Sequence, residues 1–283
     1  MYRELDSKTK KELRDYFGGR DYMVIAVPRD ELIRVYTLRA TKTVETSRRL
    51  HNLAGKEAET LGYALLSALL LTSLVKHATT QKVLIKIQNN CGTVAAEADG
   101  MGRTRGFIEN YPHECWAEGT LSVVKELRLG TPYTSIVPLV GRNFKESLSF
   151  YFEQSEQTRT YLDMSLLFDE NGNVRHACAY LVQVLKGVSQ KSIDIIEENL
   201  REISLDEEGP EELAVSILKE MEPRLIGLKE VEYYCPCSEE VARASLLLLG
   251  QEELEDILSE GPAEVVCKFC KRVYRFSREQ LML

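Results

Sequence analysis

Alternation of apolar and polar residues predicts several β-strands in the first two thirds of the chain. YMVIAV (22–27) and LIRVYTLR (32–39) are joined by PRDE, which is typical of a hairpin connection. In KVLIKIQ (82–88), every second residue is valine or isoleucine. GTVAAEADG (92–100) and RTRGFIENY (103–111) follow as a predicted meander. Period-two patterns of this kind place one face of a sheet on an apolar core.

Two further stretches favour strands at particular places in a sheet. TPYTSIVPLV (131–140) contains Pro138, which cannot donate to a central ladder and therefore indicates an edge strand. RTYLDMSLLFDENGNVRHACAYLVQVLKG (159–187) holds two strand patterns around ENGN. Asn-Gly accepts the positive φ of a tight turn, so these two patterns predict a hairpin.

Helical spacing of apolar residues predicts helices over 46–77 and 143–158. The part from 61 to 75, LGYALLSALLLTSLV, is apolar nearly all round. It is too short to span a bilayer and has polar flanks, so we expect a helix buried in a protein core.

After Gly187 the pattern changes to two or three amphipathic helices around an acidic DEEGPEE break. Such helices need a partner surface to be stable. The ordinary interpretation is a helical connector with a solvated acidic face. Its apolar positions recur at helical spacings and include Ile193, Ile196, Leu200, Leu213, Ile217 and Leu218.

The last segment is short and carries two helical patterns, SEEVARASLLLL (238–249) and QEELEDILSEG (251–261). Ser238 is a suitable N-cap, and the acids after it favour a helix N-terminus. A domain of this size often needs a metal or another staple. We therefore predict an α+β protein with an N-terminal domain of mixed sheet and helix (1–187), an acidic helical linker (188–231) and a small C-terminal domain (232–283).

Composition and charge exclude several classes of function. The net charge is −8 and the pI about 5.3, which argues against a general nucleic-acid or anionic membrane surface. The chain shows no secretory signal, so we expect a cytoplasmic protein. It also lacks a Gly-rich phosphate loop and a Gly-x-Ser-x-Gly elbow, and its four histidines are scattered: His51, His77, His113 and His176. We therefore do not expect an enzyme.

Four of the seven cysteines form a pattern near the C-terminus: Cys235-Pro-Cys237, a spacer of 29 residues, and Cys267-x-x-Cys270. Two close pairs separated by a long spacer are typical of a tetrahedral zinc site, Zn²⁺ being the expected cofactor. Basic residues beside the second pair would favour the thiolates. Cys91, Cys115 and Cys178 lie outside the pattern; Cys178 reads as an inert buried thiol, and Cys115 beside Trp116 as a second redox candidate.

A closed tetrathiolate leaves no open position for a substrate, so the metal is a structural element or a switch. A disulfide inside Cys-Pro-Cys would close a very small ring, and strained disulfides are labile. Reversible oxidation with zinc release is one possibility. The others are a constitutive binding module with a structural zinc, contacting RNA through the basic second pair, and a thiol oxidoreductase using Cys267 and Cys270. The last lacks the strand-to-helix context of a thioredoxin motif.

The cysteine pattern, YFEQSEQT (151–158), AYLVQVL (179–185) and EELEDILSEGPAEVVCKFCKRVYRF (252–276) resemble the thirty-three-kilodalton redox-regulated chaperonin family (heat shock protein 33). The resemblance covers the whole chain in order. It implies zinc on the four cysteines in an inactive reduced monomer. It further implies that oxidants form Cys235–Cys237 and Cys267–Cys270, release zinc and unfold the C-terminal domain and linker. The resulting homodimer would hold unfolded client proteins without ATP. The candidates for client contact are then the apolar linker residues Ile193, Ile196, Leu200, Leu213, Ile217 and Leu218.

Overall fold

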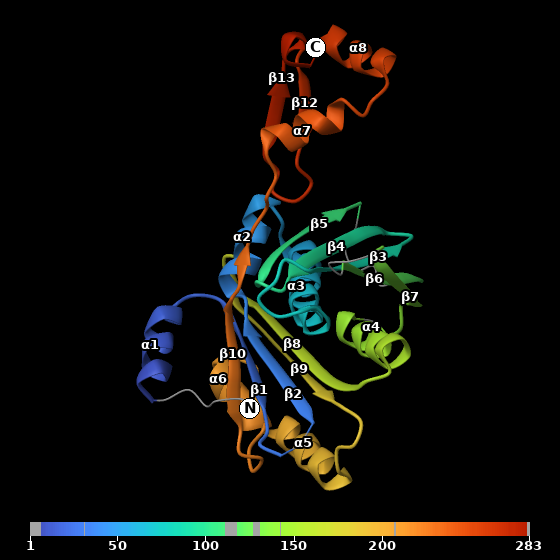
Figure 1. Ribbon diagram of the computed structural model, residues 1–283. Helices are drawn as coiled ribbons and strands as arrows, with labels where there is room; N and C mark the ends of the chain where they lie inside the picture. Colours follow the sequence, from blue (N-terminus) through green and yellow to red (C-terminus); the bar gives the residue numbers. More distant parts are fainter. Residues whose placement is uncertain are drawn as a thin grey trace. The chain divides into compact units, whose positions relative to one another are not determined.

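A computed structural model describes residues 7–30, 32–110, 118–126, 131–141, 143–206 and 208–281 (Figure 1). The chain divides into two compact units, Met1–Tyr233 and Tyr234–Leu283. Among the described residues, no helix is long and apolar enough to cross a membrane. The helices of the first unit are α1 (Ser7–Phe17), α2 (Thr41–Leu50), α3 (Gly55–Leu71), α4 (Phe144–Tyr151), α5 (Gln190–Glu202) and α6 (Pro210–Ile217).

The first sheet is antiparallel and has the strand order β10-β1-β2-β9-β8. Its strands are β1 (Tyr22–Val27), β2 (Ile33–Arg39), β8 (Arg159–Phe168), β9 (Val174–Val184) and β10 (Arg224–Glu230). The predicted hairpin is confirmed: Gly172 has φ +76° in the turn between β8 and β9. Both faces of this sheet are covered, because successive residues point to opposite sides. In β1, Met23 belongs to the core around α3 and Val24 to the core under α5 and α6.

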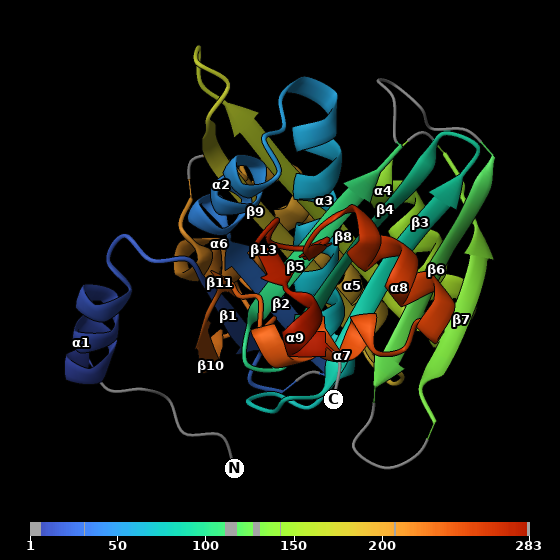
Figure 2. The same cartoon turned by 90° about the horizontal axis from the view of Figure 1, so that it is seen from above.

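The second sheet has the order β11-β5-β4-β3-β6-β7, as Figure 2 shows for its five longer strands. Its strands are β3 (Lys82–Asn89), β4 (Gly92–Asp99), β5 (Arg103–Glu109), β6 (Gly119–Glu126), β7 (Tyr133–Pro138) and β11 (Glu232–Tyr233). Strand β7 lies at the edge and ends at Pro138, as predicted. Strand β6 was not predicted.

Helix α3 contacts strands of both sheets (Figure 1), so the prediction of a buried apolar helix is confirmed. Its packing is close at Gly62, where an added Cβ would lie 2.6 Å from Leu166 Cδ2 of β8. A larger residue at this position would force the Leu166 side chain to move within a closely packed core.

The segment after Gly187 forms α5, α6 and then strand β10. Of the two or three helices predicted for this segment, two are formed, and residues 224–230 form a strand. Strand β10 pairs with β1 along its whole length, and Leu225 and Leu228 pack against the core under α5 and α6. Its place at an open sheet edge supplies backbone partners that the sequence pattern does not reveal. Residues 188–233 belong to the first compact unit; their behaviour as a separate linker stays a prediction.

The second unit contains α7 (Glu239–Leu246), α8 (Gln251–Glu260), a hairpin of β12 (Ala263–Val266) and β13 (Val273–Phe276), and α9 (Arg278–Leu281). Both predicted helices are confirmed. Its apolar core consists of few side chains: Ala242, Leu246, Leu254, Leu258, Ala263, Phe276 and Leu281.

Candidate metal centre

The structure brings together the four cysteines that the sequence singled out. The Sγ atoms of Cys235, Cys237, Cys267 and Cys270 all lie within 4.8 Å of one another. Two of the distances are 3.6 Å, between Cys235 and Cys267, and 3.3 Å, between Cys237 and Cys270. No histidine belongs to this cluster, and His113 lies outside the described residues.

Local hydrogen bonds shape both cysteine pairs. After Cys237, Ser238 caps α7 by accepting from the backbone N–H of Val241 at 3.3 Å. In the second pair, the N–H of Cys267 donates to the carbonyl of Arg272, and the N–H of Lys271 donates to the carbonyl of Cys267, both at 2.9 Å. Lys271 adopts φ +59°, which turns the chain back into β13. These bonds present two sulfurs from the tight turn that joins β12 to β13.

The donor set fits zinc. Tetrahedral coordination with Zn–S bonds of 2.3 Å separates the sulfurs by about 3.8 Å. The measured separations are close to that value, and all four side chains are partly exposed, so an ion can reach them. Cys235, Cys237, Cys267 and Cys270 would hold the ion, which would cross-link the chain before α7 to the β12–β13 hairpin.

Hydrogen bonding makes two of the sulfurs electrostatically unequal. Burial opposes ionisation of Cys237, but hydrogen bonds from Tyr274 and from the other three thiols outweigh it and lower the pKa of Cys237 to about 7. Burial, together with hydrogen bonds to the other thiols, raises the pKa of Cys270 to about 12. A bound cation would favour the thiolate form of both.

Cys178 and Cys91 take no part in this cluster. Cys178 is buried in β9 and donates to the carbonyl of Leu38 at 3.0 Å. Burial raises the pKa of its thiol to about 12, so it is an inert core residue, as the sequence indicated. Cys91 is disulfide-bonded. Cys115 and Trp116 lie outside the described residues.

The six candidate client-contact residues lie in the core between the first sheet and helices α5 and α6. Ile193, Ile196, Leu213, Ile217 and Leu218 are buried, and Leu200 is partly buried beside them. The partner surface that these amphipathic helices required is therefore the face of the first sheet. Client binding by these residues stays a prediction, since they are covered in this state.

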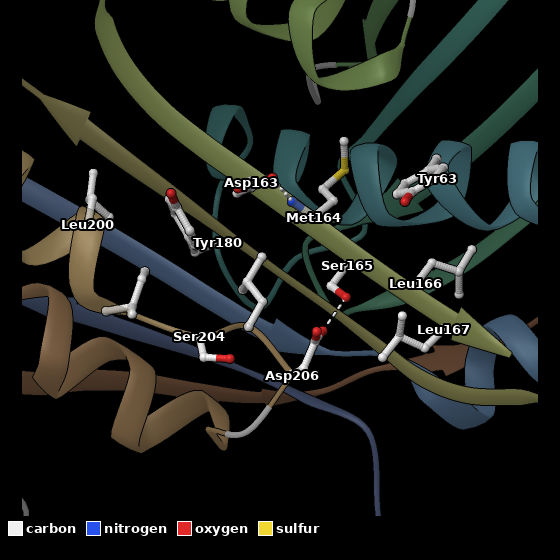
Figure 3. A pocket seen from close by; sticks show the side chains of 12 residues that line it. Tyr63, Asp163, Met164, Ser165, Leu166, Leu167, Tyr180, Leu200, Ser204 and Asp206 are labelled. Atoms are coloured by element: carbon white, nitrogen blue, oxygen red, sulfur yellow. Dashed lines mark hydrogen bonds between the residues drawn. The ribbon is translucent and has the colours of Figure 1, made fainter. Parts of the chain in front are cut away.

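Polar contacts that the sequence did not reveal hold the same helices to the sheet. Tyr22 of β1 donates to Glu211 of α6 in a buried hydrogen bond, and Thr37 Oγ1 donates to the carbonyl of Pro210 at 2.6 Å. Ser165 of β8 donates to Asp206, at the rim of an open cavity of about 410 Å³ (Figure 3). These pairs are far apart in sequence and leave no local pattern.

This chain is similar to known proteins over most of its length. The model of the family described as "Hsp33 protein" matches residues 21–277. The "33 kDa chaperonin" of Aquifex aeolicus is 48% identical over 98% of this chain and 93% of its own length. The "33 kDa chaperonin" of Enterococcus faecalis is 30% identical over 93% of this chain and 95% of its own length. The crystal structure of the 33 kDa chaperonin from Thermotoga maritima, 30% identical, covers 93% of this chain and 96% of its own with a TM-score of 0.83. The chain belongs to the Hsp33 family.

Proposed function

We propose that this protein is a redox-regulated, ATP-independent chaperone of the cytoplasm and not an enzyme. In the reduced state the four cysteines hold zinc and the protein is inactive; oxidation activates it to bind unfolding proteins and prevent their aggregation. The observation that carries the proposal is the group of four thiols within 4.8 Å of one another in a unit with a small apolar core. The names of the relatives, 33 kDa chaperonin, support the chaperone class.

The chemical event is the loss of four thiolate ligands. We assign the disulfides to Cys235–Cys237 and Cys267–Cys270, each formed by a two-electron oxidation that converts two thiolates into one disulfide. When bound, zinc supplies a cross-link and folding free energy, both of which vanish with its ligands. The small core of the second unit then lacks the stability to persist alone.

Unfolding of the second unit would affect the client-contact residues because the two are joined along the chain. Strands β10 and β11 run directly into Cys235, and β10 follows α6. Unpairing of β10 from β1 would loosen α5 and α6 and expose Ile193, Ile196, Leu200, Leu213, Ile217 and Leu218. Exposed apolar faces of this kind bind other unfolded chains, or a second copy in the active homodimer.

One experiment tests this function. Zinc-loaded protein is treated with hydrogen peroxide at elevated temperature, and zinc release and suppression of client aggregation are followed together. We expect both to rise in parallel. Cys178→Ala is the control, because this thiol is buried outside the cluster. Zinc loss with no gain in aggregation suppression would contradict the proposal and favour a purely structural zinc.

A further inference from the structure

A tyrosine outside the cysteine pattern contacts one of the four sulfurs. Tyr274 lies in β13, and its ring packs against the small core of the second unit. Its hydroxyl donates a hydrogen bond to Cys237 Sγ at 3.2 Å. Arg272 Nη1 lies 3.5 Å from the same hydroxyl oxygen and donates to it.

The order of donors in this chain of contacts is set by chemistry. Arginine has donors only, so the tyrosine oxygen accepts from Arg272 and its single hydrogen is left for the sulfur. A cationic donor polarises the hydroxyl and strengthens the hydrogen bond that the hydroxyl makes in turn. Arg272 also fixes the second cysteine pair through its carbonyl, which accepts from the N–H of Cys267 at 2.9 Å.

We propose that Tyr274, oriented by Arg272, is a positioning residue of the metal centre that stabilises the Cys237 thiolate and slows its oxidation. The inference rests on zinc binding by the four cysteines, which belongs to the proposed function. Tyr274 itself contributes no ligand. It acts through Cys237, and it ties that sulfur to the hairpin that carries the second cysteine pair.

Two physical effects follow from a hydrogen bond to a metal-binding thiolate. Partners of the ligands orient them, and their loss typically weakens metal binding by 10–100-fold. The hydrogen bond also withdraws electron density from the sulfur, which lowers its nucleophilicity. Tyr274 therefore raises zinc affinity and at the same time delays attack by an oxidant.

The oxidant in this step is a peroxide, and the group oxidised is the Cys237 sulfur. The Cys237 sulfur attacks one peroxide oxygen, the O–O bond breaks, and hydroxide leaves, giving a sulfenic acid. A second cysteine thiolate then attacks that sulfur, the S–O bond breaks, and a second hydroxide leaves as the disulfide forms. Without the Tyr274 hydroxyl, the Cys237 sulfur enters the first step without this hydrogen bond and attacks the peroxide faster.

The test compares reduced, full-length wild-type protein with Tyr274→Phe, which keeps the ring in the core and removes the hydroxyl. Zn²⁺ affinity is measured by competition with a chromogenic chelator. The Cys237 environment is monitored in the Co²⁺-substituted protein by its sulfur-to-metal charge-transfer band. We expect zinc affinity to fall about 10-fold, the band to shift, and zinc release under hydrogen peroxide to be several-fold faster. Unchanged affinity with an unshifted band would overturn the proposal.

A matched pair of arginine variants tests the role of Arg272 separately. Arg272→Gln removes the donor to Tyr274, whereas Arg275→Gln removes the same charge from the same hairpin by breaking an exposed ion pair with Glu264. We expect Arg272→Gln to weaken zinc binding more than Arg275→Gln, and equal affinities would contradict the orienting role. These readouts need no chaperone assay, so the inference and the proposed switch can fail independently.

Discussion

The two units of this protein are stabilised in different ways. The first unit buries α3 between two sheets and covers the other face of the first sheet with α5 and α6, so it has two apolar cores. The second has one small core and a cluster of four cysteines. Apolar burial depends little on redox conditions, whereas thiolate ligation depends on them entirely. If the four cysteines hold zinc as proposed, one chain combines a permanent scaffold with a domain whose stability depends on redox conditions.

Removal of the metal should break this contrast most strongly. Cys267→Ser/Cys270→Ser removes two of the four zinc ligands, and zinc binding supplies about 10–16 kcal/mol in small zinc domains. We expect peptides from Tyr234–Leu283 to lose protection in amide hydrogen exchange, while the core strands of the first unit keep theirs. Retained protection of α7 and α8 in the variant would show that the small core suffices without metal.

Truncation of the core under α6 should weaken the scaffold instead. Ile217 is fully buried, so Ile217→Ala should lower the free energy of unfolding by about 2–5 kcal/mol. The loosened helices should be cut faster by protease and should suppress client aggregation in the reduced, zinc-loaded state. Val215→Ala on the same helix is the control, because Val215 is 46% exposed. Equal protease sensitivity of the two variants would contradict a link between this core and activity.

Buried Lys229 should make the attachment of β10 depend on pH. Its ammonium donates to Thr72 Oγ1 at 2.7 Å, and burial lowers the pKa of Lys229 to about 8, against a smaller opposing effect of Asp99. Between this value and the pKa of about 10.4 for a free lysine, the unfolded state binds more protons, so the free energy of unfolding rises with pH, by about 3 kcal/mol in total.

The measurement uses urea unfolding at about pH 7 and about pH 10. Lys229→Met has no titratable group at this position, so its difference in stability from the wild type isolates the lysine. We expect the wild type to gain stability relative to the variant as pH rises. A constant difference across this window would show that the ammonium is not penalised by burial.

Loss of a single buried hydrogen bond should have the smallest effect. Burial, with the neighbouring Glu211 carboxylate, raises the pKa of Tyr22 and keeps its hydroxyl a donor. Tyr22→Phe leaves Glu211 buried without this donor, at a cost of about 1–3 kcal/mol, seen as a lower urea midpoint at constant slope. Tyr161→Phe should shift the midpoint less, because Glu197 keeps its ion pair with Arg159. A larger shift for Tyr161→Phe would reverse this order.

The strands and helices with clear periodicity were predictable from sequence. The hairpin around Gly172, the edge strand ending at Pro138 and the buried helix α3 follow from local preferences that the fold respects. Strand β10 was not predictable from sequence, because its position at the edge of the first sheet supplies its hydrogen bonds. Strand β6 was also missed, although it lies between β3 and β7 in the second sheet.

The sequence by itself determined the pattern of four cysteines, the family resemblance and the need of the acidic helices for a partner. Each depends on residue type and spacing, which can be read along the chain. Only the tertiary structure decided which surface those helices cover, that Tyr22 meets Glu211, and that Tyr274 meets Cys237. Such contacts join residues far apart in sequence, and a hydrogen bond requires a separation near 3 Å that only the folded chain establishes.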